Sequence, residues 1–140
     1  MILKILQKLN LWLPVALWAL LIFNFSSGRV PSVSDVYWQD FAFKKFGHIL
    51  IYGALALLTY RALLGEGFSR KNAVITAILL STMYGASDEF HQSFTRGREP
   101  TIRDVFIDGI GATLFTMLTY RLLPLMPKEI RILGERVGIS

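Results

Sequence analysis

The apolar residues of the chain fall into four long blocks separated by shorter polar stretches. The blocks run from Leu9 to Phe25, from Phe46 to Leu64, from Ala73 to Phe90 and from Ile102 to Leu123. A helix rises about 1.5 Å per residue, so roughly 20 residues cross about 30 Å of hydrocarbon, and each block approaches that length. The pattern predicts an all-α polytopic membrane protein, built as a bundle of four antiparallel transmembrane helices in one domain over residues 1–140.

The first block requires a choice between a retained helix and a cleaved signal peptide. Lys4 and Lys8 precede the block and the small residues Ser26 and Ser27 follow it, as they would in a signal peptide. The apolar stretch of a signal peptide, however, spans only about 7–15 residues, the first block is longer, and three more blocks follow. We therefore expect a retained helix, in which the bilayer tolerates Pro14.

The connections between the blocks differ in character. Residues 65–72 contain glycines and basic residues in a short turn, so the second and third helices should form a tight hairpin. Residues 26–45 are longer and contain Pro31 and several aromatic side chains, and we expect them to lie as a loop on the membrane interface. Residues 124–140 mix apolar and basic positions, which predicts an amphipathic segment on the membrane surface.

Charge indicates how the helices are oriented. Placing the N-terminus inside puts more lysines and arginines on the inner side of the membrane than on the outer side, where Arg29 would lie. We therefore expect a multi-pass protein of the cell membrane with both termini in the cytoplasm. The net charge of +5 does not indicate nucleic-acid binding, because the basic residues form no single stripe. The absence of cysteine excludes disulfides, zinc–thiolate sites and a thiol nucleophile.

With this topology, the polar residues that interrupt the blocks fall at one end of the predicted bundle, the extracytoplasmic end. They are Ser27, Lys45, His48, Tyr52, Asp88, Glu89, His91, Gln92, Arg98, Asp104 and Asp108. An ionisable side chain within a membrane segment is costly unless it reaches water or a partner, and such residues usually mark a functional site. The other end of the bundle shows only ordinary flanking charges.

Helical spacing places several of these residues on shared faces. His48 and Tyr52 are four residues apart, as are Asp104 and Asp108, so each pair lies on one side of its helix. Gly111 and its small neighbours would let another helix backbone approach closely, which brings the aspartates near their partners.

The residue types suggest two kinds of chemistry. Asp88, Glu89, His91 and His48 form a candidate acid/base group, because carboxylates beside histidines are suited to proton transfer. Arg98 is suited to binding a phosphate or carboxylate in a bidentate manner. The other candidate substrate-binding residues are Gln92, Tyr52, Lys45, Ser27, Asp104 and Asp108. The same carboxylates and histidines could also bind a divalent cation. Because no metal-ligand spacing such as H-E-x-x-H is present, we assign no metal site, and the sequence leaves that question and any cofactor open.

Most of these residues also have a structural interpretation, which stays open at this point. Ser27 could cap a helix end, Lys45 could be a flanking charge, and His48 could turn its polar edge toward the interface. Asp104 could complement the positive end of the fourth helix. Asp88 with its neighbouring glutamate is harder to explain in this way, because two adjacent carboxylates cannot both be buried cheaply.

These residues carry a resemblance to the VanZ-like family of small membrane proteins. The stretch from Gly85 to Arg98, followed by Asp104 and the region of Gly111, is similar to the central motif of that family. Phe25–Ser27 and Lys45–Tyr52 resemble its two earlier motifs. The resemblance extends from about residue 23 to about residue 118, and the D-E-x-H-Q-x-F segment with G-R downstream is specific.

Two positions depart from the pattern of the family. Asp108 stands where the family usually has Asn, and Arg96 stands where it usually has Pro. The first adds a carboxylate to the expected site, and the second adds a cation to the loop. The resemblance implies a bacterial-type protein of the cell membrane whose namesake lowers susceptibility to the glycopeptide teicoplanin. It implies no settled biochemical mechanism, and whether the protein is an enzyme stays open.

Two functional hypotheses follow from the sequence. In the first, the extracytoplasmic polar residues bind, or bind and modify, a lipid-linked or amphiphilic component of the cell envelope. In the second, the protein is a non-enzymatic membrane interaction protein whose polar cluster is a structural network of ion pairs. The expected partners are the lipid bilayer, an anionic or lipid-linked envelope molecule and a second copy of the chain, but no nucleic acid. A transporter of four short helices would require such an oligomer.

Overall fold

The computed structural model describes residues 2–28, 34–96, 98 and 100–139, which are helical with short connections. Arg29, Pro31 and Gly97 lie outside the described residues. The elements are α1 (Ile2–Ser26), α2 (Tyr37–Gly65), α3 (Arg70–Gln92), α4 (Ile102–Leu122), the 3₁₀ turn η1 (Leu123–Leu125) and α5 (Lys128–Val137). The predicted all-α architecture of four long helices is therefore confirmed.

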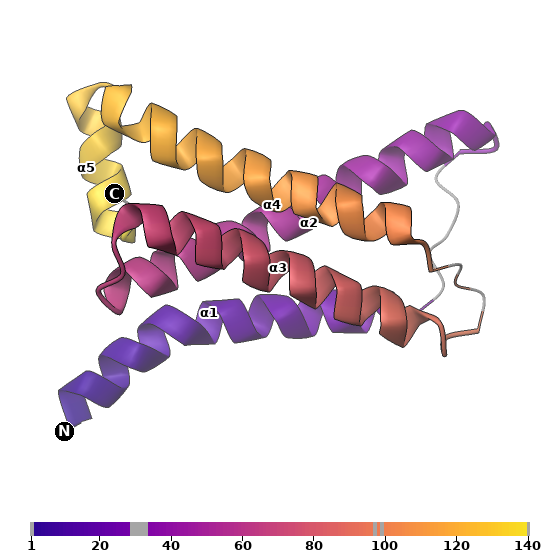
Figure 1. Ribbon diagram of the computed structural model, residues 1–140, viewed down its shortest axis with the longest axis horizontal. Coiled ribbons are helices and arrows are strands. Elements are labelled where there is room, and N and C mark those ends of the chain that lie inside the picture. The colour runs from indigo at the N-terminus through magenta and orange to yellow at the C-terminus, as the bar shows by residue number, and fades with distance from the viewer. Residues whose placement is uncertain (1, 29–33, 97, 99, 140) are drawn as a thin grey trace.

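The four long helices run side by side (Figure 1). The contacts of α2, α3 and α4 with one another are the most extensive, whereas α1 packs mainly on α2 and diverges from the bundle toward its own start. The start of α1 and the whole of α5 lie at one end, which we call the terminal end. The connections that follow α1 and α3 lie at the opposite end, which we call the loop end.

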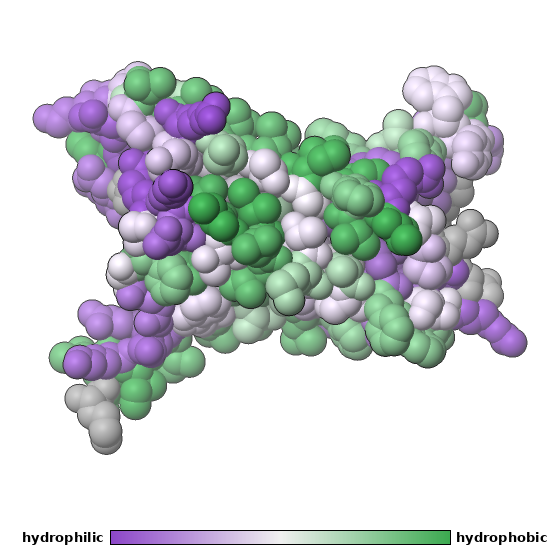
Figure 2. Space-filling model, in the orientation of Figure 1, coloured by the Kyte–Doolittle hydropathy of each residue, from purple (hydrophilic) through white to green (hydrophobic). Residues whose placement is uncertain are grey.

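Three of the helices are long and apolar enough to cross a membrane: α1, α2 and the segment from Ile102 to Leu125 that begins with α4. The fourth long helix, α3, is 23 residues long, but Asp88 and Glu89 near its C-terminal end lower its hydropathy. It lies alongside the other helices, and its acidic end is buried against them. Figure 2 shows apolar surface across the middle of the molecule, with hydrophilic residues concentrated toward its two ends.

The start of α2 differs from the sequence prediction. The loop expected over residues 26–45 is wrong in its second half, because α2 begins at Tyr37 rather than at Phe46. An ion pair of 2.6 Å between Asp40 and Lys44, one helical turn apart, stabilises this extension. The Tyr37 and Phe41 rings stack with centroids 6.4 Å apart. Polar and aromatic residues thus continue the helix beyond the apolar block.

The hairpin between α2 and α3 is as tight as predicted. Gly67 has a φ of +91°, a left-handed conformation that suits glycine, and it directly precedes the approach to α3. The Ser69 side chain then accepts a hydrogen bond of 3.3 Å from the backbone N–H of Asn72 and caps the start of α3. This geometry turns the chain back along α2.

Small residues let α2 and α4 approach closely in the middle of the bundle. A Cβ atom added to Gly111 would lie 2.5 Å from the backbone oxygen of Ile49, so only glycine fits there without movement. Ala56, Ala77 and Ala112 are fully buried, one on each of α2, α3 and α4. The close approach predicted around Gly111 is confirmed, and it sets the distance at which the polar side chains of the two helices meet.

The C-terminal segment folds into α5, across the terminal end of the bundle (Figure 1). The Arg61 side chain donates hydrogen bonds to the backbone oxygens of Val137, at 2.7 Å, and of Asn10, at 3.0 Å. Ile130 and Leu133 remain exposed on α5 beside its charged residues, as expected for an amphipathic helix. Its placement on a membrane surface stays a prediction.

Candidate functional site

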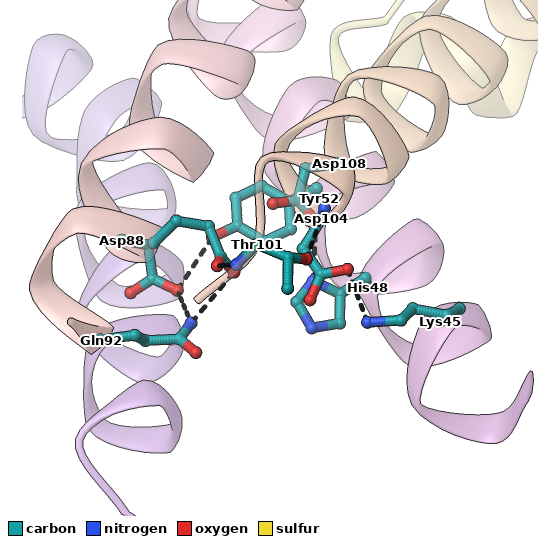
Figure 3. Close-up of polar contacts among 9 residues, drawn as sticks. Lys45, His48, Tyr52, Asp88, Gln92, Thr101, Asp104 and Asp108 are labelled. Carbon is teal, nitrogen blue, oxygen red and sulfur yellow. Dashed lines mark hydrogen bonds and ion pairs between the residues drawn. The ribbon is translucent and has the colours of Figure 1, made fainter. Parts of the chain in front are cut away.

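The polar residues predicted from the sequence gather at the loop end of the bundle, in contacts between α2, α3 and α4 (Figure 3). We define the polar site as Lys45, His48, Tyr52, Asp88, Glu89, His91, Gln92, Arg98, Thr101, Asp104 and Asp108. Two pairs connect α2 with α4. The Lys45 ammonium lies 2.5 Å from a carboxylate oxygen of Asp104, and Nδ1 of His48 lies 2.8 Å from one of Asp108.

A second set of contacts connects α2 with α3. The Tyr52 hydroxyl donates a hydrogen bond of 3.2 Å to Oδ2 of Asp88. The Gln92 amide donates to the same oxygen at 2.9 Å, and to Oε1 of Glu89 at 3.4 Å. The His48 and Tyr52 rings are stacked with centroids 6.2 Å apart, so the contacts of α2 with α4 and with α3 are themselves adjacent.

Glu89 reaches the backbone at the start of α4. Its Oε2 accepts a hydrogen bond of 2.8 Å from the N–H of Thr101. The Thr101 side chain in turn accepts from the N–H of Asp104 at 3.3 Å and caps α4. Thr101 was not predicted from the sequence, although Thr-x-x-Asp directly before an apolar block is a capping signal.

The acidic residues of the polar site are almost completely buried. Asp108 is 1% exposed, Asp88 5%, Glu89 6% and Asp104 7%. Gly85 on α3 allows this packing, because a Cβ atom there would lie 2.8 Å from Oδ2 of Asp108. The importance of Gly85 was not predicted individually, although it begins the D-E-x-H-Q motif region.

Arg98 attaches the connection between α3 and α4 to the end of α1. One of its terminal guanidinium nitrogens donates to the backbone oxygen of Phe25, and its Nε is buried without a hydrogen-bond partner. Burial lowers the pKa of the Arg98 guanidinium from its ordinary value, and the charges of Asp88 and Glu89 oppose that shift. Arg98 is thus placed beside the acids of α3.

Two predicted residues lie at the margin, against α1. The His91 ring packs on the Phe23 ring with centroids 4.5 Å apart, and its Nδ1 is buried without a partner. The Ser27 hydroxyl donates to the backbone oxygen of Phe23 at 2.7 Å, and the residue is exposed. Its neighbour Ser26 is the buried serine, at 4% exposure. The hydrogen bond of Ser27 stays within the end of α1 and does not join Ser27 to the polar site.

Buried side-chain atoms that lack a hydrogen-bond partner are concentrated in the polar site. In the described part of the chain, five buried side-chain atoms have no hydrogen-bond partner: Ser81 Oγ, Asp88 Oδ1, His91 Nδ1, Arg98 Nε and Asp108 Oδ2. All except that of Ser81, one turn before Gly85 on α3, belong to the polar site. Over the same residues, no group of three or more histidine and acidic side chains has an arrangement that could hold a metal ion.

The chemistry available is acid–base chemistry and charged hydrogen bonding. Four carboxylates face Lys45, Arg98 and the His48 imidazole in a largely buried setting. Such groups bind complementary charges strongly, because the surrounding dielectric is low. Histidine beside a carboxylate is also a common arrangement for proton transfer.

Comparison with known proteins supports the resemblance noted in the sequence. A family model described as VanZ/LLP1 matches residues 5–124, a range that contains every residue of the polar site. No curated protein and no solved structure matches the chain. The match extends across all four long helices and stops before α5.

Proposed function

We propose, from the premise that this chain belongs to the VanZ/LLP1 family, that its polar site binds an amphiphilic or lipid-linked component of the cell envelope at the extracytoplasmic face of the membrane. The observation that carries this proposal is that four of the five buried side-chain atoms without a hydrogen-bond partner, among the residues that the structure describes, belong to the polar site. A polar group buried without a partner costs about 1–3 kcal/mol. A network that served only to hold the helices together would be expected to satisfy these atoms internally.

The proposal gives each part of the site a role. Arg98 holds an anionic headgroup, because its Nε is unpartnered and a guanidinium suits phosphate and carboxylate groups. Asp88 and Glu89 serve as acid/base groups or accept a cationic part of the ligand, with His48 and His91 beside them. Tyr52 and Gln92 orient the ligand through Asp88, the residue to which both donate.

The remaining candidate residues support the ligand from the edge of the site. Lys45 and Asp104 add a charged pair near the loop end, and Asp108 anchors His48. Ser27 is exposed just after α1. The neighbouring carboxylates and histidines would also allow the bound component to be modified, and we extend the proposal to lowered teicoplanin susceptibility, as the family resemblance implies.

The first experiment compares teicoplanin susceptibility in a sensitive Gram-positive host that carries the wild type or Glu89→Gln at matched membrane abundance. The control is Glu129→Gln on α5, an exposed glutamate at the terminal end. Protection by the wild type and the control, but not by Glu89→Gln, supports a working site. Equal protection by all three contradicts it.

A direct binding measurement complements the host assay. Native mass spectrometry of the purified protein should find a co-purifying anionic lipid with the wild type and with Arg121→Ala, an exposed arginine near the end of α4. Arg98→Ala should lose most of that lipid. If the wild type carries no such lipid and Arg98→Ala is unchanged, the binding proposal fails.

A specific observation also supports the second hypothesis, that the cluster is a structural network. The pairs Lys45–Asp104 and His48–Asp108 join α2 to α4. The charged groups in each pair are bonded to one another, so they already stabilise the contact between the helices without a ligand. Under this hypothesis Glu89→Gln lowers the amount of folded protein in the membrane. Under the binding hypothesis it leaves abundance normal and removes the effect.

A further inference from the structure

An apolar groove lies between α3 and α4. Its volume is about 510 Å³, and it is lined by Ile78, Thr82, Val105, Phe106, Gly109, Ile110, Thr113 and Leu114. We call it the α3–α4 groove. Gly109 lies opposite Thr82, because a Cβ atom at position 109 would lie 3.3 Å from the Thr82 hydroxyl. The absence of a side chain at Gly109 therefore keeps the groove open at this point.

The interface of α3 with α4 leads from the groove toward the polar site. Gly109 on α4 contacts Thr82 on α3, while the preceding residue, Asp108, contacts Gly85, almost one turn further toward the loop end. Beyond that contact lie Asp88 and the other acids of α3. The interface of α3 with α4 therefore changes from apolar to charged in the direction of the loop end, which is the polarity of an amphiphile with its headgroup at the membrane surface.

The dimensions of the groove suit a single hydrocarbon chain. From Val105 to Leu114 the groove extends over about 13 Å at about 1.5 Å per residue. A volume of about 510 Å³ over that length leaves a cross-section of roughly 40 Å². Phe106 and Ile110 in its lining are 70% and 57% exposed, so the groove opens to the side of a bundle whose helices are long enough to cross a membrane, where hydrocarbon chains surround it.

We propose that the α3–α4 groove holds an acyl or isoprenoid chain of the same amphiphile whose headgroup engages the polar site. This inference rests on the proposed function and specifies its ligand as a molecule with one long hydrocarbon chain beside an anionic headgroup. Gly109, Thr113 and Thr82 line the groove. The protein then binds its ligand with an affinity that depends on the length of the ligand's hydrocarbon chain as well as on its headgroup.

The test uses two probes that share a phosphate headgroup, dodecyl phosphate and butyl phosphate, with the full chain in lipid nanodiscs and retention measured by native mass spectrometry. Two variants fill the groove independently, Gly109→Leu and Thr113→Phe. The control is Ala16→Leu, which adds nearly as much apolar bulk as Gly109→Leu, but at an exposed position on α1. Thr113→Phe fills the groove from a second, exposed position one turn further along α4, so it keeps the test usable if Gly109→Leu does not fold.

We expect the wild type and Ala16→Leu to retain dodecyl phosphate about fivefold better than butyl phosphate. Thr113→Phe and any folded Gly109→Leu should reduce dodecyl phosphate to the level of butyl phosphate, without changing butyl phosphate retention. Arg98→Ala should weaken both probes equally. If groove-filled variants keep the wild-type preference for the long chain, or if the wild type holds both probes equally, the groove inference is wrong while the headgroup site stands. If the wild type holds neither probe, the proposed function fails, and the inference with it.

Discussion

The Asp108 carboxylate uses its two oxygens differently. Oδ1 lies 2.8 Å from Nδ1 of His48, whereas Oδ2, packed against Gly85, has no hydrogen-bond partner in the described part of the protein. One buried side chain thus joins α4 to α2 and also presents an unsatisfied acceptor toward α3. Both properties can be separated by substitution.

Asp108→Asn should be nearly neutral for stability. The amide keeps the volume of the carboxylate and can still form a hydrogen bond with His48, so we expect a loss of about 1 kcal/mol or less in the free energy of unfolding. Asp108→Leu leaves His48 unpaired and should cost about 2–3 kcal/mol. Thermal unfolding of both variants in the same detergent measures the difference, and equal losses would show that the contact with His48 contributes little.

Lys45 and Asp104 should behave as a coupled pair. Their side chains are 18% and 9% exposed, so removing one partner leaves the other charge in a poorly hydrated position. We expect Lys45→Met and Asp104→Asn each to destabilise more than half as much as the double variant, with a coupling of about 1–2 kcal/mol. A double-mutant cycle of unfolding free energies measures this coupling, and strict additivity would contradict it.

Gly111→Ala should push α2 and α4 apart. The added methyl group would lie 2.5 Å from the Ile49 backbone oxygen, and overpacking of this kind costs about 1–3 kcal/mol. The matched control is Gly47→Ala, where a Cβ atom has no neighbour within 4 Å and removal of a helical glycine should be neutral or stabilising. The melting temperatures of the two variants should move in opposite directions or differ clearly, and a similar shift in both would falsify the close crossing.

Thr101→Val should weaken the start of α4. Valine keeps the backbone N–H that donates to Glu89 but loses the oxygen that accepts from Asp104, and the loss of such a cap costs about 1 kcal/mol. Thr101→Ser keeps the hydroxyl and serves as the control. Hydrogen exchange at the first turn of α4 should rise for the valine variant alone.

Arg61→Ala should release α5 from the bundle. Arg61 holds the backbone of Val137 at the end of α5 and that of Asn10 on α1, and alanine removes both contacts. We expect faster tryptic cleavage within α5, at Lys128, Arg131 or Arg136, while the long helices stay protected. Arg121→Ala, at an exposed position, is the control, and equal cleavage of both variants would mean that Arg61 does not anchor α5.

The number and approximate position of the helices could be predicted from hydropathy, because burial in lipid requires long apolar segments. The first nine residues of α2 could not, since Tyr37, Asp40 and Lys44 are not apolar. They are helical because of local ion pairing and ring stacking, which act over one turn and leave no apolar block. Hydropathy therefore predicted the apolar middle of each helix better than it predicted the residues at which the helix begins and ends.

The sequence predicted which residues gather in the candidate site, but it did not predict which of them form hydrogen-bonded or charged pairs. Because successive helices are antiparallel, the start of α2, the end of α3 and the start of α4 lie at the same end of the bundle. His48, Asp88 and Asp108 could therefore be expected there. Which carboxylate pairs with which cation depends on how α2 and α4 cross, and that is set by backbone contact at Gly111. The bond from Thr101 to Glu89 was not predictable in the same way, because its donor is a backbone N–H that every non-proline residue has.

The pairing of α2 with α4 has a consequence for biosynthesis. Lys45 and His48 are separated by 59 and 60 residues from the aspartates that they contact. Because α2 precedes both carboxylates in the chain, any insertion of α2 ahead of α4 requires the apolar residues of α2 to offset the cost of these two side chains. Lys45 and His48 can gain their carboxylate partners only once α4 has been made, so the paired arrangement of α2 with α4 depends on the last long helix.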